Sequence, residues 1–320
     1  MKNVTFRTDL AIEEVAKIDC NKIEGVNTKE FTCFNILINK TKINKKHDKR
    51  LSKKAGLYYT LDLQNININD NQTQENIIKA LSKVLIEIIE SKNLLDKKAM
   101  VIGLGNINVT PDSLGPYTLD NIIVTRHLFS NNIINEGYSE VSGYSPGVMG
   151  TTGIETSDIV GGIFEKVNPD FVIVVDALAS LDSNRVNKTI QITDTGISPG
   201  SGVGNKRKEI SSKSLNVPVI AIGVPTVVDA VTLTNDVLDK VLIYLKKHLK
   251  DDANKLGLLS EVSMDERKML MNDAIGNTVY NMIVTPKEVD EVIEDFGKII
   301  ASSIDIALHK RLRDEYIINH

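Results

Sequence analysis

Almost uninterrupted apolar runs of strand length constrain the fold of this chain more than any other feature. They are AMVIGLG at 99–105, FVIVV at 171–175 and VPVIAIGV at 217–224, together with the shorter run TIQIT at 189–193. Strands that are apolar at nearly every position are buried on both faces, as parallel strands covered by helices usually are. All of these runs are far shorter than the roughly 20 residues needed to cross a bilayer. They predict a buried sheet and no membrane partner.

Segments with helical periodicity alternate with these runs. Residues 73–92 carry a wide apolar stripe, and 113–129 and 154–167 each favour one helix. The sequence T-P-x-E at 285–288 matches a capping box that starts a last amphipathic helix. Because strands and helices alternate, we expect an α/β fold, with a mixed, mostly parallel sheet covered by helices on both faces.

The N-terminal part of the chain adds strands of another kind. The runs CFNILI at 33–38 and GLYYTLDL at 56–63 predict a β-hairpin or a pair of edge strands, so we expect a β-rich insertion over 33–66. Between Lys40 and Lys54 lie eight basic residues, one acidic residue and no aromatic one. This segment is either a solvated loop or a steering patch for an acidic partner. Grooves for single-stranded nucleic acid interleave aromatic side chains, so we expect no direct nucleic-acid partner.

Composition narrows the class of protein further. The chain has 320 residues, of which 42% are hydrophobic and 25% charged, as in ordinary globular proteins. Its 38 Lys and Arg residues against 42 Asp and Glu give a net charge of -4, too balanced for a protein that mainly grips a phosphate backbone. The two cysteines, Cys20 and Cys33, form no disulfide framework or paired metal motif. With no secretory signal visible, we expect a cytoplasmic protein.

Two carboxylates stand where strands of the predicted sheet end. Asp176 directly follows FVIVV, and Asp112 follows the strand at 99–105 after a short glycine-rich segment. Ligands of open α/β sheets bind beyond the carboxyl ends of the strands. If the two side chains meet, one can hold a proton while the other stays ionised, which supplies the acid and the base for peptide hydrolysis by water. Asp112 has a second interpretation, as the N-cap of the helix at 113–129.

Other catalytic and binding patterns are weaker. The five histidines include no HExxH motif, and no GxSxG nucleophile elbow is present. The glycine-rich segments 103–116 and 195–208 match neither familiar phosphate loop, because Asn108 stands where a dinucleotide motif needs its third glycine and no Gly-Lys-Ser/Thr follows. Such segments are typical of tight turns. A noncatalytic nucleotide-binding module remains an alternative.

Several long strings of this sequence resemble those of one family. They are RTDLA, GLGN followed by TPDSLGP, VTRHLF, SPGVMGTTGIET, VVDALA, TDTGISPGSGVGNKRKE, IGVPTVVDA and MIVTPKEVD, and they run from about residue 7 to residue 295. The combination resembles the germination proteases of spore-forming bacteria and, more distantly, the hydrogenase maturation endopeptidases. The resemblance implies an atypical aspartic endopeptidase that degrades small acid-soluble spore proteins during germination.

The resemblance assigns roles to particular residues. The two family aspartates fall on TPD and VVDA, which are Asp112 and Asp176 here. It implies catalysis by these two side chains on water, with neither assigned as acid or base, because a coupled pair titrates as one unit. Ser198 stands at the turn where the hydrogenase maturation enzymes place a metal-binding histidine. Two carboxylates with no third strong ligand make a tight metal site unexpected, so we expect no metal and no cofactor. A metal-dependent maturation-type endopeptidase on the same fold remains an alternative.

The resemblance also implies a zymogen. Family substrates are cut after an acidic residue and before an apolar residue followed by Ala, and Asp9-Leu10-Ala11 has that form. Residues 1–9 would then be a prosegment, removed by self-cleavage between Asp9 and Leu10, and 10–320 a single α/β peptidase domain. Phe6 departs from the family pattern, which prefers an acid four positions before the cut. A homotetramer in the cytoplasm of the spore core is implied as well, with acidification of the spore interior as the hypothetical trigger of cleavage.

Overall fold

The apolar runs form neighbouring strands in the middle of one sheet. The computed structural model describes residues 8–18, 23–46, 51–131, 133, 136–199, 208–248 and 282–318. Within these ranges nine strands form a single mixed sheet with the order β1-β2-β3-β7-β8-β6-β4-β5, and the short β9 pairs with β8. The strands are β1 (Val26–Cys33), β2 (Ile36–Ile43), β3 (Gly56–Asp62), β4 (Ala99–Gly103), β5 (Val141–Tyr144), β6 (Phe171–Ser180), β7 (Thr189–Thr193), β8 (Val219–Asp229) and β9 (Ile283–Val284).

The sheet has two halves with different pairing. Strands β8, β6, β4 and β5 are parallel, whereas β1, β2, β3, β7 and β9 pair antiparallel with their neighbours. The prediction of a mixed α/β sheet is confirmed, but parallel pairing is limited to one half. The reason is that β3 pairs with β7, so the strands of the N-terminal β-rich segment extend the central sheet instead of standing apart from it.

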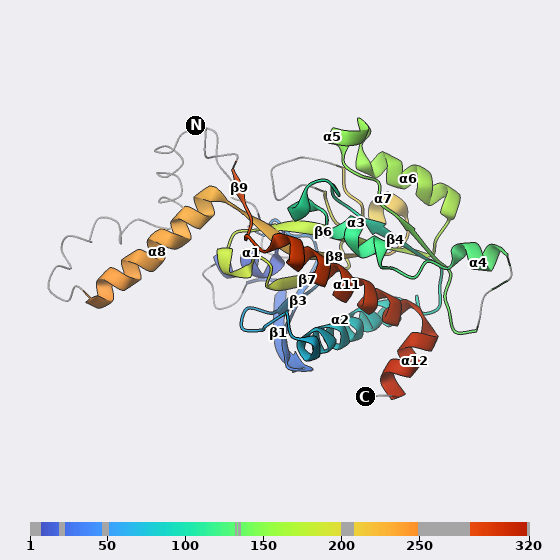
Figure 1. Cartoon of the computed structure of the whole chain (residues 1–320), viewed down its shortest axis with the longest axis horizontal. Coiled ribbons are helices and arrows are strands. Elements are labelled where there is room, and N and C mark those ends of the chain that lie inside the picture. Colours follow the sequence, from blue (N-terminus) through green and yellow to red (C-terminus); the bar gives the residue numbers. More distant parts are fainter. Residues whose placement is uncertain are drawn as a thin grey trace.

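Helices cover both faces of the sheet, as expected (Figure 1). On one face α2 (Asn71–Ser91), α3 (Leu114–Asp120) and α11 (Val289–Leu308) bury their apolar sides in the larger core. On the other face α6 (Thr156–Val167) and α7 (Ser212–Leu215) pack over the parallel strands. Strand β6 serves both layers because its residues alternate: Ile173 and Val175 face the first core, and Val172 and Val174 the second.

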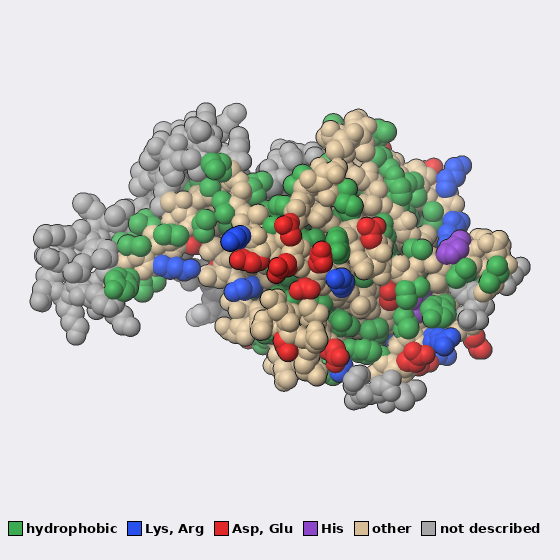
Figure 2. Space-filling model, viewed as in Figure 1, with side chains coloured by type: hydrophobic (Ala, Val, Ile, Leu, Met, Phe, Trp, Pro, Cys, Tyr) green, Lys and Arg blue, Asp and Glu red, His purple; other side chains and the backbone are tan. Residues whose placement is uncertain are grey.

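The remaining helices lie at the periphery. Helix α1 (Ala11–Lys17) packs on the antiparallel half, where Ala11 contacts Ile43 and Tyr58. Helix α8 (Ala230–His248) extends away from the body and carries the exposed apolar side chains Val237, Val241, Ile243 and Tyr244 (Figures 1 and 2). Short helices α4 (Arg126–Ser130), α5 (Met149–Thr152) and α12 (Lys310–Ile318) complete the set of elements discussed here. None of the described helices combines the length and the apolarity that a membrane crossing requires.

The prediction of a single helix over 113–129 is wrong. The structure has α3 and α4, separated by an extended connection that contains the β-branched run Ile122–Thr125. Such residues lose side-chain freedom in a helix and favour extended backbone. Tertiary hydrogen bonds hold the connection in place, since Ile123 N–H donates to Asp305 at 3.1 Å and Thr125 N–H donates to Val141 O at 2.9 Å.

Two further local predictions are wrong. The run at 33–38 is not one strand, because Phe34 and Asn35 adopt positive φ angles of 49° and 63° and form the turn between β1 and β2. The T-P-x-E sequence does not cap α11: the helix begins at Val289, and its N-cap, Glu288, makes no side-chain cap hydrogen bond. The Thr285 hydroxyl donates instead to Thr226 O at 2.9 Å.

A buried polar cluster fastens α11 to the connection between α3 and β5. Asp305 accepts the Ile123 N–H, and the fully buried His309 accepts the Ser139 N–H at Nδ1 over 3.2 Å. Burial raises the pKa of Asp305 to about 7, and burial lowers the pKa of His309. The folded state therefore favours the neutral form of both side chains.

This cluster predicts a pH-dependent stability. The folded-state pKa of Asp305 lies above its unfolded value, so its contribution to stability is complete below about pH 4 and is lost as the pH rises towards about 7. Relative to an Asp305→Asn variant, the wild-type protein should lose up to about 4 kcal/mol of unfolding free energy over that interval. Urea unfolding of both proteins at a series of pH values measures the difference. A difference that does not vary with pH would contradict the expectation.

Candidate active site

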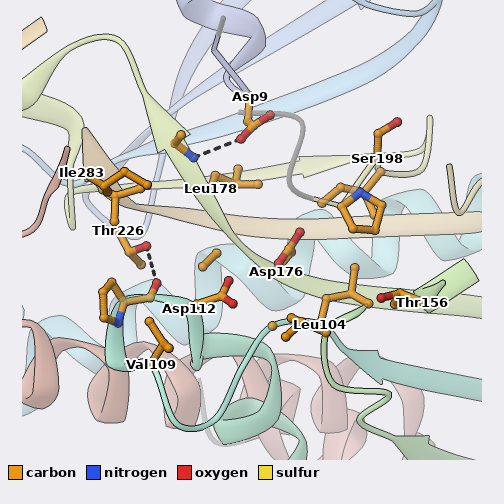
Figure 3. Close-up of a pocket in the computed structure, with 18 of the residues that line it drawn as sticks. Asp9, Leu104, Val109, Asp112, Thr156, Asp176, Leu178, Ser198, Thr226 and Ile283 are labelled. Atoms are coloured by element: carbon orange, nitrogen blue, oxygen red, sulfur yellow. Dashed lines mark hydrogen bonds between the residues drawn. The ribbon is translucent and has the colours of Figure 1, made fainter. Parts of the chain in front are cut away.

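A cavity of about 370 Å³ lies where the parallel strands end. This volume is within the range of ordinary small-molecule and peptide-side-chain sites. Its walls come from the segment after β4, from the second half of β6, from β8 and from the turn after β7; they include Asp9, Leu104, Asp112, Asp176, Ser198 and Thr226 (Figure 3). The two aspartates singled out by the sequence therefore line one cavity, and Figure 3 shows both side chains directed into it.

Close backbone packing brings the segment after β4 to the middle of β6. Gly103 pairs with Val175, and Leu104 N–H donates to Val175 O at 2.8 Å, which places Leu104 beside the position of Asp176. A Cβ atom on Gly115 would lie 2.2 Å from Leu104 O and 2.6 Å from Val175 O, closer than real Cβ atoms approach. Only glycine permits this contact between the start of α3 and the two strand ends.

A tight loop then returns Asp112 to the same place. Gly105 has a φ of +116°, and a Cβ atom there would lie 1.9 Å from Asp112 O. Asn106 N–H donates both to Asp112 O at 3.0 Å and to Asp112 Oδ2 at 2.9 Å. Asp112 ends the 3-10 turn η1 (Thr110–Asp112), and Ser113 is the N-cap of α3. The interpretation of Asp112 as a helix N-cap is therefore wrong, and its carboxylate is held at the cavity instead.

Thr226 of β8 supports this loop from the opposite side of the cavity. Its hydroxyl donates to Pro111 O at 2.6 Å, so the hydrogen bond fixes the residue directly before Asp112 (Figure 3). Thr226 is 1% exposed, and its own carbonyl accepts the Thr285 hydroxyl. A chain of hydrogen bonds thus runs from the segment after β9 through β8 to the aspartate-bearing turn.

Asp176 is nearly buried, with 6% of its surface exposed. It lies on the same face of β6 as Val172 and Val174, and its strand neighbour on β8 is Gly223. The expectation that the strand ends before Asp176 is wrong, because Asp176 is the sixth of the ten residues of β6. A carboxylate buried within a strand is costly unless partners compensate it. Two such side chains on one cavity can divide the roles of proton donor and proton acceptor between them.

The chain itself enters the cavity at Asp9. Asp9 N–H donates to Ala179 O at 3.2 Å, and the Asp9 carboxylate accepts Ala179 N–H at 3.0 Å, so one residue of β6 binds both groups. Leu10 and Ala11 are fully buried. The peptide bond between Asp9 and Leu10, where self-cleavage is expected, is therefore held next to the cavity by the folded domain. Residues 1–7 of the expected prosegment lie outside the described ranges.

A second group of contacts fixes the residues on either side of that bond. The Thr8 hydroxyl accepts Leu10 N–H at 3.0 Å and donates to the carboxylate of Glu13. Glu13 also accepts the Ser180 hydroxyl at 2.6 Å and Leu181 N–H at 2.9 Å, both at the end of β6. Lys53, from the basic segment 40–54, donates to Thr8 O at 2.7 Å, which gives this lysine a role inside the molecule.

Sequence reasoning missed the residues that hold residues 8–11. Gln191 on β7 hydrogen-bonds to Asp9 and Ala11. Glu13 connects Thr8 to Ser180 at the end of β6. One signal was visible, since Gln191 is the only amide in the otherwise apolar and hydroxyl-bearing strand TIQIT. Asp229, which also follows an apolar run, lies elsewhere: it accepts Thr232 N–H at 2.8 Å at the start of α8.

Among the described residues, the side chains around the cavity do not form a cluster of metal ligands. Within the described ranges, no group of three or more His, Cys, Asp or Glu side chains is close enough to hold an ion. Ser198 lines the cavity beside the two aspartates, and a neutral hydroxyl is a weak ligand for a transition metal. The glycines of the segment 103–116 pack against the chain itself, as Gly105 and Gly115 show, and leave no cradle for a phosphate. Residues 200–207 of the other glycine-rich segment lie outside the described ranges.

The fold is of the α/β class, and comparison with known proteins identifies the chain as a peptidase. The model of one protein family, described as Germination protease, matches residues 6–255 and 247–319. These matches cover nearly the whole sequence, so the chain belongs to the germination protease family.

Individual relatives give the same result. The germination protease of Clostridium tetani is 42% identical, with 98% of each chain covered. Those of Bacillus pumilus and Bacillus subtilis are 41% and 40% identical, each with 97% of this chain and 95% of the relative covered. Among solved structures, a nickel–iron hydrogenase maturation protease from Thermococcus kodakarensis matches with 13% identity and a TM-score of 0.32, covering 69% of this chain and 98% of that one.

The contact between Thr226 and Pro111 predicts a loss of activity when it is removed. Thr226→Val keeps the shape of the side chain but leaves Pro111 O without its donor, so the turn that carries Asp112 loosens. We expect peptide hydrolysis to fall by about 10-fold, the equivalent of one hydrogen bond. Thr226→Ser, which keeps the hydroxyl, should stay close to wild type. Steady-state peptide hydrolysis and thermal unfolding of both variants check this; full activity of the valine variant would show that the contact does not position the site.

Proposed function

We propose that this chain is the zymogen of an endopeptidase that cleaves small acid-soluble spore proteins during germination, after an acidic residue and before an apolar residue followed by Ala. Asp112 and Asp176 activate the attacking water, and residues 1–9 are the prosegment, removed by self-cleavage between Asp9 and Leu10. The observation that carries the proposal is that one cavity is lined by both aspartates and by the residue that precedes the bond to be cut.

The chemistry needs only these two carboxyl groups and one water molecule. The ionised aspartate takes a proton from water as the water oxygen bonds to the carbonyl carbon of the peptide. The protonated aspartic acid gives its proton to the leaving nitrogen, and the carbon–nitrogen bond breaks. The products are a carboxylic acid and an amine, and the pair of aspartates returns to its starting charge. Neither aspartate is assigned as the acid or the base in this proposal, because a coupled pair titrates as one unit.

The contacts of residues 8–11 support processing within the same fold. Ala179 binds the Asp9 backbone and side chain, and the fully buried Leu10 continues into α1. The proposed trigger is protonation of one aspartate as the spore interior acidifies, since the pair needs one proton to divide the two roles.

The partners and location follow from the family. The proposed substrates are the spore's small acid-soluble proteins, and the proposed location is the spore core. The apolar side chains exposed along α8 offer a surface for association into the tetramer that the resemblance implies.

Replacing either aspartate by asparagine should abolish peptide hydrolysis. Asparagine keeps the size of the side chain but can neither accept nor donate the proton that moves in the reaction, so we expect a loss of about 100- to 10,000-fold for Asp112→Asn and for Asp176→Asn. Peptides that contain Glu-Phe-Ala, analysed by mass spectrometry, measure the rate. Asp314→Asn, at an exposed position of α12, is the matched control and should keep full activity.

Two results would change the proposed mechanism. Undiminished cleavage by both asparagine variants would refute the aspartate pair. Activity that disappears with a chelator and returns with zinc would favour the metal-dependent alternative instead.

Replacing Asp9 should prevent correct processing. Asp9→Ala removes the carboxylate that Ala179 N–H binds, so the bond before Leu10 loses its anchor. In mildly acidic buffer, mass spectrometry should show wild-type protein and Asp9→Glu beginning at Leu10, and Asp9→Ala still carrying its first nine residues. The same shortened N-terminus in all three proteins would disprove cleavage at this bond.

A further inference from the structure

One side-chain amide spans the peptide segment that enters the cavity. Gln191 Nε2 donates to Asp9 O at 2.9 Å, and Gln191 Oε1 accepts Ala11 N–H at 2.6 Å. The carbonyl of one residue and the N–H of the second residue after it are the groups that a neighbouring strand would bind. The Gln191 amide therefore takes the place of a strand and fixes the register of this segment.

The position of Gln191 in the sheet relates it directly to Asp176. Both residues pair with Gly223 of β8, one from β7 and the other from β6. Ile190 and Ile192 face the larger core, so Gln191 projects from the opposite face, the one on which Asp176 also lies. Two strand spacings separate their backbones, about 10 Å, and the Leu178 side chain lies over Gly223 between them. Asp9, whose carbonyl Gln191 binds, lines the same cavity as Asp176.

The burial of Gln191 indicates a site built for a peptide backbone. The residue is 6% exposed, and buried amides are almost always hydrogen-bonded. Among the described residues, the hydrogen bonds found for this amide go to Asp9 and Ala11. A segment with the same backbone groups can satisfy the amide once residues 8 and 9 are cut off and residues 10 and 11 move out of the site.

Groups next to Gln191 contact the side chains of residues 8–11 and favour particular residue types there. Ala179 N–H binds the carboxylate of Asp9, which selects an acid before the bond. Ala11 is fully buried against Ile43 and Tyr58, which leaves room for a small side chain only, two residues later. Gln191 binds the backbone between the acidic residue and the alanine. It therefore fixes the distance between the two positions at which these side chains are recognised.

We propose that Gln191 is a specificity-determining residue that positions the bond to be cut, by binding the carbonyl oxygen before this bond and the N–H of the second residue after it. The inference rests on the proposed cleavage after Asp9. The same Nε2–H group points at the carbonyl oxygen that gains negative charge when water attacks, so it also stabilises that charge.

Two peptides that differ in a single N–H group test the proposal. Both contain Glu-Phe-Ala, but in one of them lactate replaces this alanine, so that an ester oxygen stands where Gln191 Oε1 would accept the N–H. Wild-type enzyme should cleave the lactate peptide about 10-fold more slowly at the Glu-Phe bond. Gln191→Leu should be slower on the alanine peptide by about 100-fold, and it should no longer distinguish the two peptides.

A second variant separates the two hydrogen bonds. Gln191→Glu keeps an acceptor for the N–H but loses the donor when ionised, so it should still distinguish the peptides while its kcat falls. It also keeps the test decisive if the leucine variant does not fold. Gln72→Leu, at an exposed position of α2, is the control and should leave both rates unchanged.

The outcomes distinguish this inference from the proposed function. If folded Gln191→Leu or Gln191→Glu is unaltered in both rate and peptide preference, the role of Gln191 is overturned, while cleavage by wild type still supports the endopeptidase. If wild-type enzyme, processed to begin at Leu10, cleaves neither peptide, the proposed function itself fails. If wild-type enzyme distinguishes the two peptides and Gln191→Leu does not, the result supports both the role of Gln191 and the proposed function.

Discussion

The site depends on how closely the chain can fold back over the ends of two parallel strands. Gly115 lies so near Leu104 and Val175 that no side chain fits, and Gly105 makes an equally close approach to Asp112. These contacts carry the aspartate of the η1 turn back to the part of β6 that holds Asp176. A longer or looser loop would leave the two carboxylates on different surfaces, so the chemistry rests on backbone proximity more than on any single side chain.

The two halves of the sheet contribute different parts of the site. The parallel half supplies the strand ends that carry or support the aspartates, including β8 through Thr226. The antiparallel half supplies a platform for the peptide, because β7 turns its apolar residues into the core and Gln191 toward the other face. Since β8 belongs to both halves, the platform and the carboxylates are held in one rigid register.

The sequence was informative where local pattern decides structure. The apolar runs predicted the buried strands, but the prediction that a strand ends before Asp176 is wrong, because β6 continues to Ser180. Pattern failed where distant contacts decide: the Thr285 hydroxyl is taken by Thr226 instead of a helix end, and Ile123 is drawn to Asp305 on α11. Gln191 could not be recognised because its partners, Asp9 and Ala11, are about 180 residues away along the chain. The catalytic roles themselves came from the family resemblance, which the comparisons confirm at the level of the family.

Leu10 and Ala11 are buried in the folded domain, and their burial has a consequence if the proposed self-cleavage takes place. These residues continue directly into α1 and stay covalently attached to the domain when the preceding residues depart. They would then act as a tethered product, present at an effective concentration in the millimolar range for as long as α1 stays folded in place. Incoming substrate would then compete with residues 10 and 11 for the site. The rate at which α1 detaches from the domain would therefore limit how quickly the mature enzyme begins to cleave substrate.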